Sequence, residues 1–327
     1  MAGPADALAQ FRRHGGRLAA AAARFSDAPR PWLDLSTGVN PRPYPLRPVP
    51  RSALARLPDP QETAAAEAAA ARAFGAPADR VAAVPGSEIA LRLLPRLLGA
   101  RSVAIAAATY SGHAEAWRAA GVMAAADPDA AEAWVVVNPN NPDGAVTPAA
   151  DILASAERRW TIVDEAFADP AREHSVADHA KGRLVVLRSF GKFYGLPGLR
   201  LGFVVADPAL VAQVRLAQGD WPIGAAAVAA ARVAYADDAW AQAARARLAR
   251  DARRLDAMLR AGGLTPVGGT PLFRLVHAPD ATEVFLRLAR AGILCRPFED
   301  PHRLRFGLPG APRDWGRLQA ALRGDAP

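Results

Sequence analysis

One lysine is the residue of this chain best suited to covalent chemistry. The sequence holds 40 lysine and arginine residues, and all but Lys181 and Lys192 are arginines. A lysine amine can lose its proton and form an imine with a carbonyl compound, whereas a guanidinium stays charged and cannot. Lys192 follows an apolar, strand-like run at residues 184–187. Lys181 lies in the polar segment HAKGR, and we expect it at the surface.

The residues on either side of Lys192 suit a phosphate group. Ser189 precedes the lysine and Arg200 follows it eight positions later, and a hydroxyl with a planar guanidinium matches phosphate oxygens. An amine that captures an aldehyde beside a phosphate site suits pyridoxal 5′-phosphate. The stretch SFGKFYGLPGLRLG, residues 189–202, resembles the lysine motif of the aspartate aminotransferase superfamily, the fold-type I enzymes that use this cofactor.

The resemblance implies further contacts with the phosphate and with one face of the ring. Gly86, Ser87 and Glu88 follow a strand-like run and open a helical segment, so the free N–H groups of that helix would bind the phosphate. Tyr110, in ATYSGH, would lie over the pyridine ring and exclude water from it. Without the resemblance, the first segment is a common turn and Tyr110 a core tyrosine at a strand end.

Two more motifs imply contacts with the polar atoms of the ring. Asn141 lies in NPNNPDG, which resembles the family's Asn-Pro-x-Asn-Pro-x-Gly signature, and would donate to the phenolic oxygen. Asp164, in IVDEAF, ends a strand-like run, where α/β sheets bind ligands. Its carboxylate would keep the pyridine nitrogen protonated, so that the ring accepts electrons. The alternative is an Asp-Glu pair that caps the next element.

Two positions depart from the family pattern. Phe167 and Leu57 stand where many members have tyrosines. The first tyrosine donates to the phenolic oxygen, and the second reaches the phosphate bound by the partner subunit. Neither side chain here has a hydroxyl, so we expect Asn141 to contact the phenolic oxygen alone.

The cofactor residues do not decide the reaction, since they permit transamination, decarboxylation, elimination or racemisation. In the resembled superfamily, an arginine matching Arg305 usually pairs with the substrate carboxylate. Arg296 resembles an additional arginine of the branch that takes phosphorylated substrates. Arg274 is a further candidate, for which a structural salt bridge is at least as good an explanation. The division of carboxylate and phosphate between Arg296 and Arg305 stays open.

The N-terminal region narrows the branch. HGG, residues 14–16, and LDLSTGVNPRPYP, residues 33–45, resemble the threonine-phosphate decarboxylases of cobalamin biosynthesis. In that family the early histidine and the asparagine before proline help to bind the substrate phosphate. The resemblance therefore implies a substrate pocket formed by His14, Ser36, Thr37, Gly38 and Asn40.

The implied reaction converts L-threonine O-3-phosphate to (R)-1-aminopropan-2-yl phosphate and CO2, with Lys192 and Asp164 as catalytic residues. The rival activity is that of a histidinol-phosphate aminotransferase, which shares the cofactor site. A second alternative is a non-catalytic relative that acts as a scaffold for the same pathway. That alternative predicts loss of cofactor residues, yet Lys192, Asp164, Asn141 and Arg200 are all present.

The elements that must position these residues alternate strand-like runs with Ala- and Arg-rich helical segments. That alternation predicts an α/β fold with a mostly parallel sheet. We expect its strands at residues 81–84, 102–106, 133–137, 160–164, 184–187 and 201–205.

A second, smaller region follows Trp221. We expect one long helix over residues 225–261, ended by Gly262 and Gly263. A small α+β domain then has strands at 273–276, 293–296 and 304–306 and a helix at 283–291. The expected domains are a large cofactor-binding domain at 46–224 and a small one at 1–45 and 225–327, in which residues 1–45 have no sheet pattern.

Composition limits the other functions. The net charge is +8, but the arginines are scattered and no nucleic-acid module is visible, so we expect no nucleic-acid partner. No hydrophobic signal region or membrane-length run is present, which favours a cytoplasmic enzyme without membrane insertion. The single cysteine, Cys295, excludes an internal disulfide and offers no metal cluster. We expect a homodimer that binds a small phosphorylated amino acid.

Overall fold

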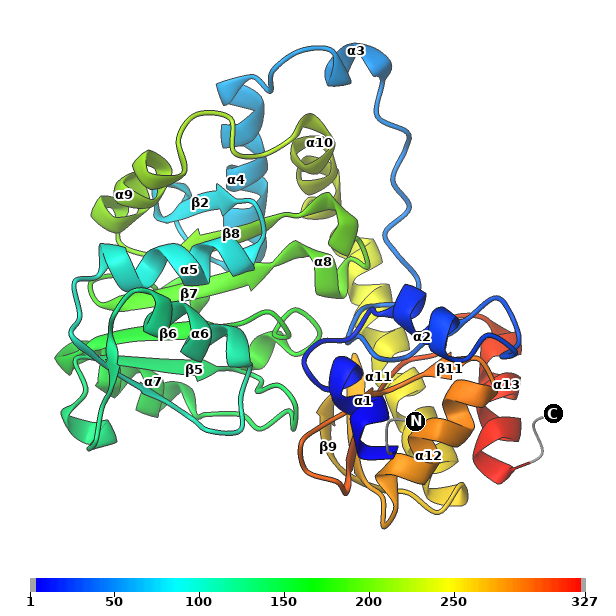
Figure 1. The fold of residues 1–327 in the computed structure, drawn as a ribbon. Coiled ribbons are helices and arrows are strands. Elements are labelled where there is room, and N and C mark those ends of the chain that lie inside the picture. The colour runs from blue at the N-terminus through cyan, green and yellow to red at the C-terminus, as the bar shows by residue number, and fades with distance from the viewer. Residues whose placement is uncertain (1–3, 325–327) are drawn as a thin grey trace. The chain divides into compact units, whose positions relative to one another are not determined.

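The computed structural model describes residues 4–324 and divides the chain into two compact units. The central unit comprises Pro43–Ala244, and the terminal unit comprises the residues up to Arg42 and those from Arg245 onward. Figure 1 labels many of their helices and strands. Residues 225–244, which the sequence prediction assigned to the small domain, belong to the central unit.

The central unit contains a seven-stranded, mostly parallel sheet in the order β2-β8-β7-β6-β5-β3-β4. Its strands are β2 (Val81–Val84), β3 (Ser102–Ile105), β4 (Met123–Ala124), β5 (Ala133–Val137), β6 (Trp160–Asp164), β7 (Leu184–Ser189) and β8 (Gly202–Val205). Only β8 is antiparallel to its neighbours. The predicted α/β fold is confirmed. The edge strand β4 was missed because its two residues are both exposed, which gives no hydrophobic alternation.

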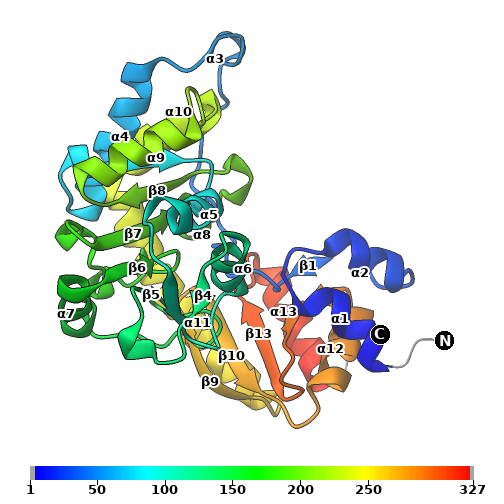
Figure 2. The ribbon, with the colours of Figure 1, turned by 60° about the vertical axis from the view of Figure 1, so that its left-hand side comes forward.

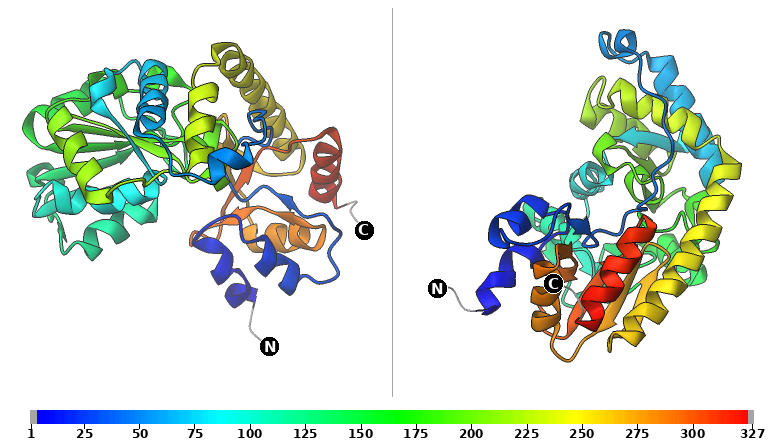
Figure 3. Two further views of the ribbon diagram at one scale, coloured as in Figure 1. Left: turned by 90° about the horizontal axis from the view of Figure 1, so that it is seen from above. Right: turned by 90° about the vertical axis from the view of Figure 1, so that its right-hand side faces the viewer.

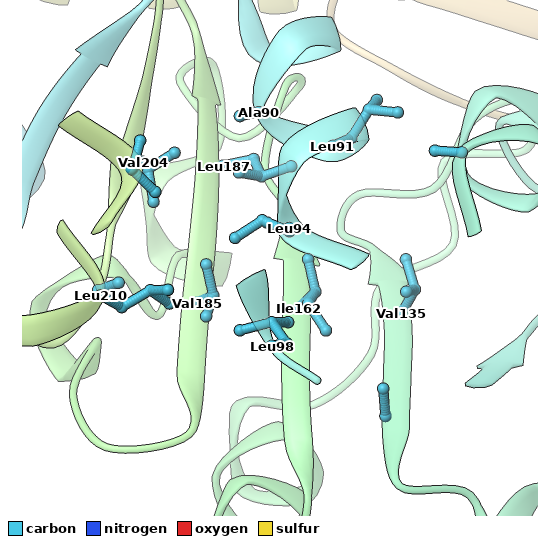
Figure 4. Packing of buried hydrophobic residues seen from close by; sticks show 14 of the residues in the cluster. Ala90, Leu91, Leu94, Leu98, Val135, Ile162, Val185, Leu187, Val204 and Leu210 are labelled. Carbon is cyan, nitrogen blue, oxygen red and sulfur yellow. The ribbon is translucent and has the colours of Figure 1, made fainter. Parts of the chain in front are cut away.

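Helices α5 (Ser87–Leu97), α6 (Ser111–Ala119) and α9 (Pro208–Gln218) bury one face of this sheet. Leu91, Leu94 and Leu98 recur at helical spacing and belong to one buried cluster, in which Leu94 and Leu98 lie against Val185, Leu187 and Ile162 of the strands (Figure 4). Full burial of one such leucine stabilises the fold by about 1.5–3 kcal/mol. The remaining helices are α3 (Arg51–Leu54), α4 (Pro60–Phe74), α7 (Ala149–Arg158), α8 (Phe190–Phe193) and α10 (Ala225–Ala234).

The predicted single helix over residues 225–261 is wrong, because the chain forms α10 and then α11 (Asp238–Ala261). Tyr235 is buried at the break, where its ring packs edge-on against Phe74. Asp237 then accepts a hydrogen bond from the N–H of Trp240 at 2.9 Å, as an N-cap residue does. The predicted stop is confirmed, since α11 ends at Ala261 and Gly263 has φ +78°.

The terminal unit contains an antiparallel sheet in the order β12-β13-β10-β9, in which β9, β10 and β13 lie side by side (Figure 2). Its strands are β9 (Thr265–Thr270), β10 (Phe273–His277), β12 (Arg296–Pro297) and β13 (Arg303–Gly307). The sequence did not predict β9, because it contains Pro266, Gly268 and Gly269. Gly269 is required there, since a Cβ on it would lie 2.3 Å from the carbonyl oxygen of Phe273.

The N-terminal segment does contribute to a sheet, contrary to the prediction. β1 (Leu33–Asp34) pairs in parallel with β11 (Ile293–Leu294). The helices of this unit are α1 (Pro4–Arg12), α2 (Leu18–Arg24), α12 (Ala281–Arg290), α13 (Pro312–Arg323) and the C-terminal part of α11. α11 and α13 lie side by side (Figure 3), and the Arg254 guanidinium lies 4.3 Å from the ring centroid of Trp315.

The described residues, 4–324, allow three chemical observations. None of the described helices combines the length and the apolar character that crossing a membrane requires. Within the same residues, histidine, cysteine, aspartate and glutamate side chains form no group of three or more that could bind a metal ion. Cys295 is buried, and this burial raises the pKa of its thiol, as expected for a thiol packed in the interior.

Candidate active site

The predicted cofactor residues lie at one edge of the seven-stranded sheet. β3, β5, β6 and β7 are parallel, so their carboxyl ends meet at this edge. β8 runs the opposite way between β7 and β2, and it therefore begins where those two strands end. The strand ends and adjoining segments contain Gly86, Ser87, Glu88, Tyr110, Asn141, Asp164, Ser189, Lys192 and Arg200.

Two glycines bring three kinds of phosphate-binding group together. Gly86 has φ +86°, and a Cβ on it would lie 2.9 Å from Nη2 of Arg200. A Cβ on Gly202 would lie 2.4 Å from the backbone nitrogen of Ser87, and Gly202 pairs with Ser189 in the sheet. The N-terminus of α5, a guanidinium and a serine thus converge. These donors fit the phosphate of the cofactor.

Asp164 contacts a histidine that the sequence analysis did not identify. Its Oδ2 lies 2.9 Å from Nε2 of His113 on α6, and its Oδ1 accepts a hydrogen bond from the N–H of Ala166 at 3.0 Å. His113 is only 1% exposed. The carboxylate is therefore fixed in a site of low polarity. Its charge would act strongly there on the protonated pyridine nitrogen of a bound cofactor. No local pattern in the sequence identifies this pair, because Asp164 lies 51 positions after His113.

Lys192 lies in the short helix α8, at the carboxyl end of β7, and is half-buried. Its Nζ lies 5.6 Å from the ring centroid of Phe167, within the range of a cation–π attraction. Phe167 thus contacts the lysine without offering a hydroxyl to the cofactor.

Asn140 connects two segments of the site. Its Oδ1 accepts a hydrogen bond from Oγ1 of Thr109 at 2.6 Å, and its Nδ2 donates to the carbonyl oxygen of Ala108 at 2.9 Å. These bonds fix the loop before Tyr110 against the turn that contains the buried Asn141. The sequence analysis assigned no role to Asn140.

A buried ion network lies on the opposite side of the strand ends. Glu165 continues the extended chain beyond β6, since its N–H donates to the carbonyl oxygen of Leu187 at 2.9 Å. Successive residues of an extended chain face opposite sides, so Glu165 points away from the side of Asp164. Its Oε2 lies 2.5 Å from Nη1 of Arg188, and Arg188 also pairs with Asp169. Ser175 Oγ donates to Glu165 at 2.6 Å. Burial raises the pKa of Glu165 more than the charge of Arg188 lowers it.

The predicted substrate residues gather within the terminal unit, although they come from opposite ends of the chain. The N–H of Gly16 donates to Oγ of Ser36 at 2.7 Å, and a Cβ on Gly15 would lie 2.3 Å from the carbonyl oxygen of Ser36. The loop that carries His14 therefore packs on Ser36 and Thr37. Ser36 and Gly38 are buried, whereas His14 and Thr37 are half-buried.

Arg296 and Arg305 are partners on adjacent strands, β12 and β13. Arg305 is 3% exposed, and its Nη2 donates to the carbonyl oxygen of Ser36 at 3.1 Å. Nη2 of Arg296 donates to the carbonyl oxygen of Arg13 at 3.1 Å. Burial, and then the charge of Arg296, lower the pKa of Arg305. Two adjacent guanidiniums would bind an anion strongly, since it relieves their mutual repulsion.

Asn40 and Arg274 have structural partners. Asn40 is buried, and its Oδ1 accepts hydrogen bonds from the N–H of Arg42 at 3.0 Å and from Nη2 of Arg247 at 3.2 Å. Arg274 pairs with Asp256 at 2.7 Å, the salt bridge that the sequence analysis offered as its alternative role. Leu57 is 62% exposed in the central unit.

The model of the family "Aminotransferase class I and II" matches residues 49–323, and the chain belongs to this family. It is an enzyme family that uses pyridoxal 5′-phosphate, so the predicted superfamily and cofactor are confirmed.

Two relatives with one name match nearly the whole chain. The threonine-phosphate decarboxylase of Pseudomonas aeruginosa is 40% identical over 95% of this chain and 97% of its own length. The threonine-phosphate decarboxylase of a Sinorhizobium species is 44% identical over 94% of this chain and 97% of its own length. In fold, the chain is similar to histidinol-phosphate aminotransferase from Sinorhizobium meliloti in complex with pyridoxal-5′-phosphate, with a TM-score of 0.75, 20% identity and 84% of each chain covered.

Proposed function

We propose that this chain decarboxylates L-threonine O-3-phosphate to (R)-1-aminopropan-2-yl phosphate and CO2, a step of cobalamin biosynthesis. The observation that carries the proposal is the 40% and 44% identity to threonine-phosphate decarboxylases along almost the whole chain. This likeness includes the terminal unit, where the His14 loop, Ser36, Arg296 and Arg305 lie together.

Each residue of the site would have its own task in this reaction. The bound cofactor supplies an electron sink for the pair that remains when the bond between Cα and the carboxylate breaks. Asp164 holds a proton on the pyridine nitrogen, and Asn141 donates to the phenolic oxygen. The backbone of Gly86–Ser87, Ser189 and Arg200 bind the cofactor phosphate. After CO2 leaves, Nζ of Lys192 delivers a proton to Cα, so that hydrogen replaces the carboxylate.

The reaction itself tests the proposal. The holoenzyme, incubated with L-threonine O-3-phosphate in D2O, is expected to release one CO2 for each amine formed and to place one deuterium on the carbon that was Cα. A histidinol-phosphate aminotransferase would instead need a keto-acid acceptor and would release no CO2. Faster turnover of histidinol phosphate with 2-oxoglutarate than of threonine phosphate would overturn the proposal in favour of that activity.

The two arginines of the terminal unit can be assigned by comparing substrate with product, which has no carboxylate. We propose that Arg305 binds the carboxylate and Arg296 the phosphate. Arg305→Met is expected to lower kcat/KM for threonine phosphate by roughly 10- to 150-fold, the value of about 1.5–3 kcal/mol for a hydrogen bond to a charged group. It should leave the Kd of the product, (R)-1-aminopropan-2-yl phosphate, unchanged. Arg296→Met should instead lower kcat/KM for threonine phosphate and also raise the Kd of the product.

Arg274→Met provides the matched control, because Arg274 lies on the neighbouring strand β10 and pairs with Asp256. It should change neither ligand's binding. A loss of product affinity in Arg305→Met equal to the loss in Arg296→Met would contradict the assignment of the carboxylate.

We also propose that the enzyme works in the cytoplasm as a homodimer, as the family resemblance implies. In the central unit, Leu54 and Leu57 are exposed before α4, and the resemblance implies that the tyrosine of other members at the position of Leu57 reaches the partner subunit. Light scattering of the purified protein measures the oligomeric state directly.

A further inference from the structure

The side chain of Glu88 is not available to the cofactor phosphate, although the residue lies in the first turn of α5. One carboxylate oxygen, Oε2, accepts a hydrogen bond from the hydroxyl of Tyr110 at 2.9 Å. The other, Oε1, accepts one from Nε of Arg92 at 2.9 Å and lies 2.7 Å from Nη2 of the same residue. A bare carboxylate at this helix end would repel a phosphate. Arg92 neutralises that charge and Tyr110 engages the second oxygen.

The ring of Tyr110 is also confined from a second side. A Cβ on Gly112 would lie 2.4 Å from Cε1 of Tyr110 and 2.9 Å from its Cζ, so the ring occupies the space that any other side chain would fill. The ring of His113 meets it edge-on, with centroids 6.1 Å apart. Burial, and then the Glu88 carboxylate, raise the pKa of the Tyr110 phenol, so the hydroxyl remains a donor.

We propose that Glu88 is a positioning residue, which fixes the plane of the Tyr110 ring and so sets the surface on which the pyridine ring of the cofactor stacks. The inference rests on the proposed stacking of Tyr110, and it assigns to Glu88 a role different from phosphate binding. A phenylalanine at position 110 would keep the stacking surface but lose the bond that orients it. A tyrosine without Glu88 would keep the hydroxyl but leave the ring free to tilt.

A double-mutant cycle on cofactor binding tests the proposal. The Kd of pyridoxal phosphate for the apoprotein is measured in the wild type, Glu88→Ala, Tyr110→Phe and the double variant. Each single change is expected to weaken binding by roughly tenfold, the loss of one charged hydrogen bond. The double variant should be no weaker than either single variant by more than about twofold, since both changes remove the same bond. The visible circular dichroism of the bound cofactor should change in both single variants, because that signal reports ring orientation.

Three further variants separate the alternatives. Glu88→Gln keeps a carbonyl oxygen to accept from Tyr110, and it should recover most of the affinity and the circular dichroism signal. Glu115→Ala removes the other carboxylate near Arg92, at 3.9 Å, and should have no effect. Gly112→Ala displaces the ring without touching Glu88, and should weaken binding as the single variants do.

The outcomes that overturn the proposal are distinct from failure of the cofactor assignment. Additive losses in the double variant, or an unchanged circular dichroism signal in Glu88→Ala, would mean that Glu88 does not act through Tyr110. A wild-type protein that bound no pyridoxal phosphate would instead refute the cofactor itself. None of these readouts depends on which substrate the enzyme takes.

Discussion

Lys192→Ala is expected to remove the covalent bond between protein and cofactor and to abolish turnover. The wild type should show a visible absorbance band and incorporate one reduced cofactor at position 192 after borohydride treatment. The variant should show neither. Its kcat should fall by at least about 10²–10⁴-fold, which is the contribution of a positioned proton-transfer group alone. Loss of the amine that forms the covalent bond should lower kcat further.

The chain provides its own control for this experiment. Lys181 is the other lysine, and it is exposed in the turn before β7. Lys181→Ala should retain the absorbance band and full activity. Labelling of a residue other than Lys192, or turnover by Lys192→Ala near the wild-type rate, would refute the assignment of the covalent lysine.

Arg188→Met is expected to destabilise the protein more than any surface substitution. The change leaves Glu165 and Asp169 buried without the guanidinium that balances their charges. Breaking a buried ion pair in this way costs about 3–5 kcal/mol. Urea titration of the apoprotein measures the free energy of unfolding. The control is Arg101→Met, which breaks the exposed pair with Glu132 and should cause little measurable loss.

The loss in free energy of unfolding caused by Arg188→Met should be larger at high pH than at low pH. Burial already raises the pKa of Glu165 in the folded protein, and removing Arg188 removes an attraction that lowers it. A carboxyl whose pKa is higher folded than unfolded favours folding at low pH and loses that contribution as pH rises through the folded value. The variant should therefore lie closer to the wild type at pH 5 than at pH 8. A deficit that grew on acidification would contradict this account.

Much of the site could be predicted because its residues stand at strand ends. Asp164, Ser189 and Asn141 follow hydrophobic runs that the sequence shows clearly, and the carboxyl ends of parallel strands meet at one edge. Lys192 was identifiable because it is one of two lysines among many arginines. In each case the chemistry of the residue and its place after a strand agree.

The parts that escaped prediction depend on contacts between distant segments. His113 and Asp164 lie 51 positions apart in the chain, and no local pattern connects them. Arg188 and Glu165 look like ordinary charged residues beside a motif, and only the alternation of the strands places them on the same side. The break before α11 was missed because helix propensity continues through Tyr235, while its burial against Phe74 and the Asp237 cap decide the local structure.

The alternation at the end of β6 has a consequence for how this enzyme can vary. Exchange of Ile162 or Val163 for another apolar residue changes only packing volume, which proteins tolerate. Insertion or deletion of a single residue in this strand would instead swap the sides of Asp164 and Glu165. Each carboxylate would then lie on the other's side, at a position shifted along the strand, so the Glu165–Arg188 and Asp164–His113 pairs would both be broken in one mutational event. The length of this strand is therefore constrained more tightly than its composition.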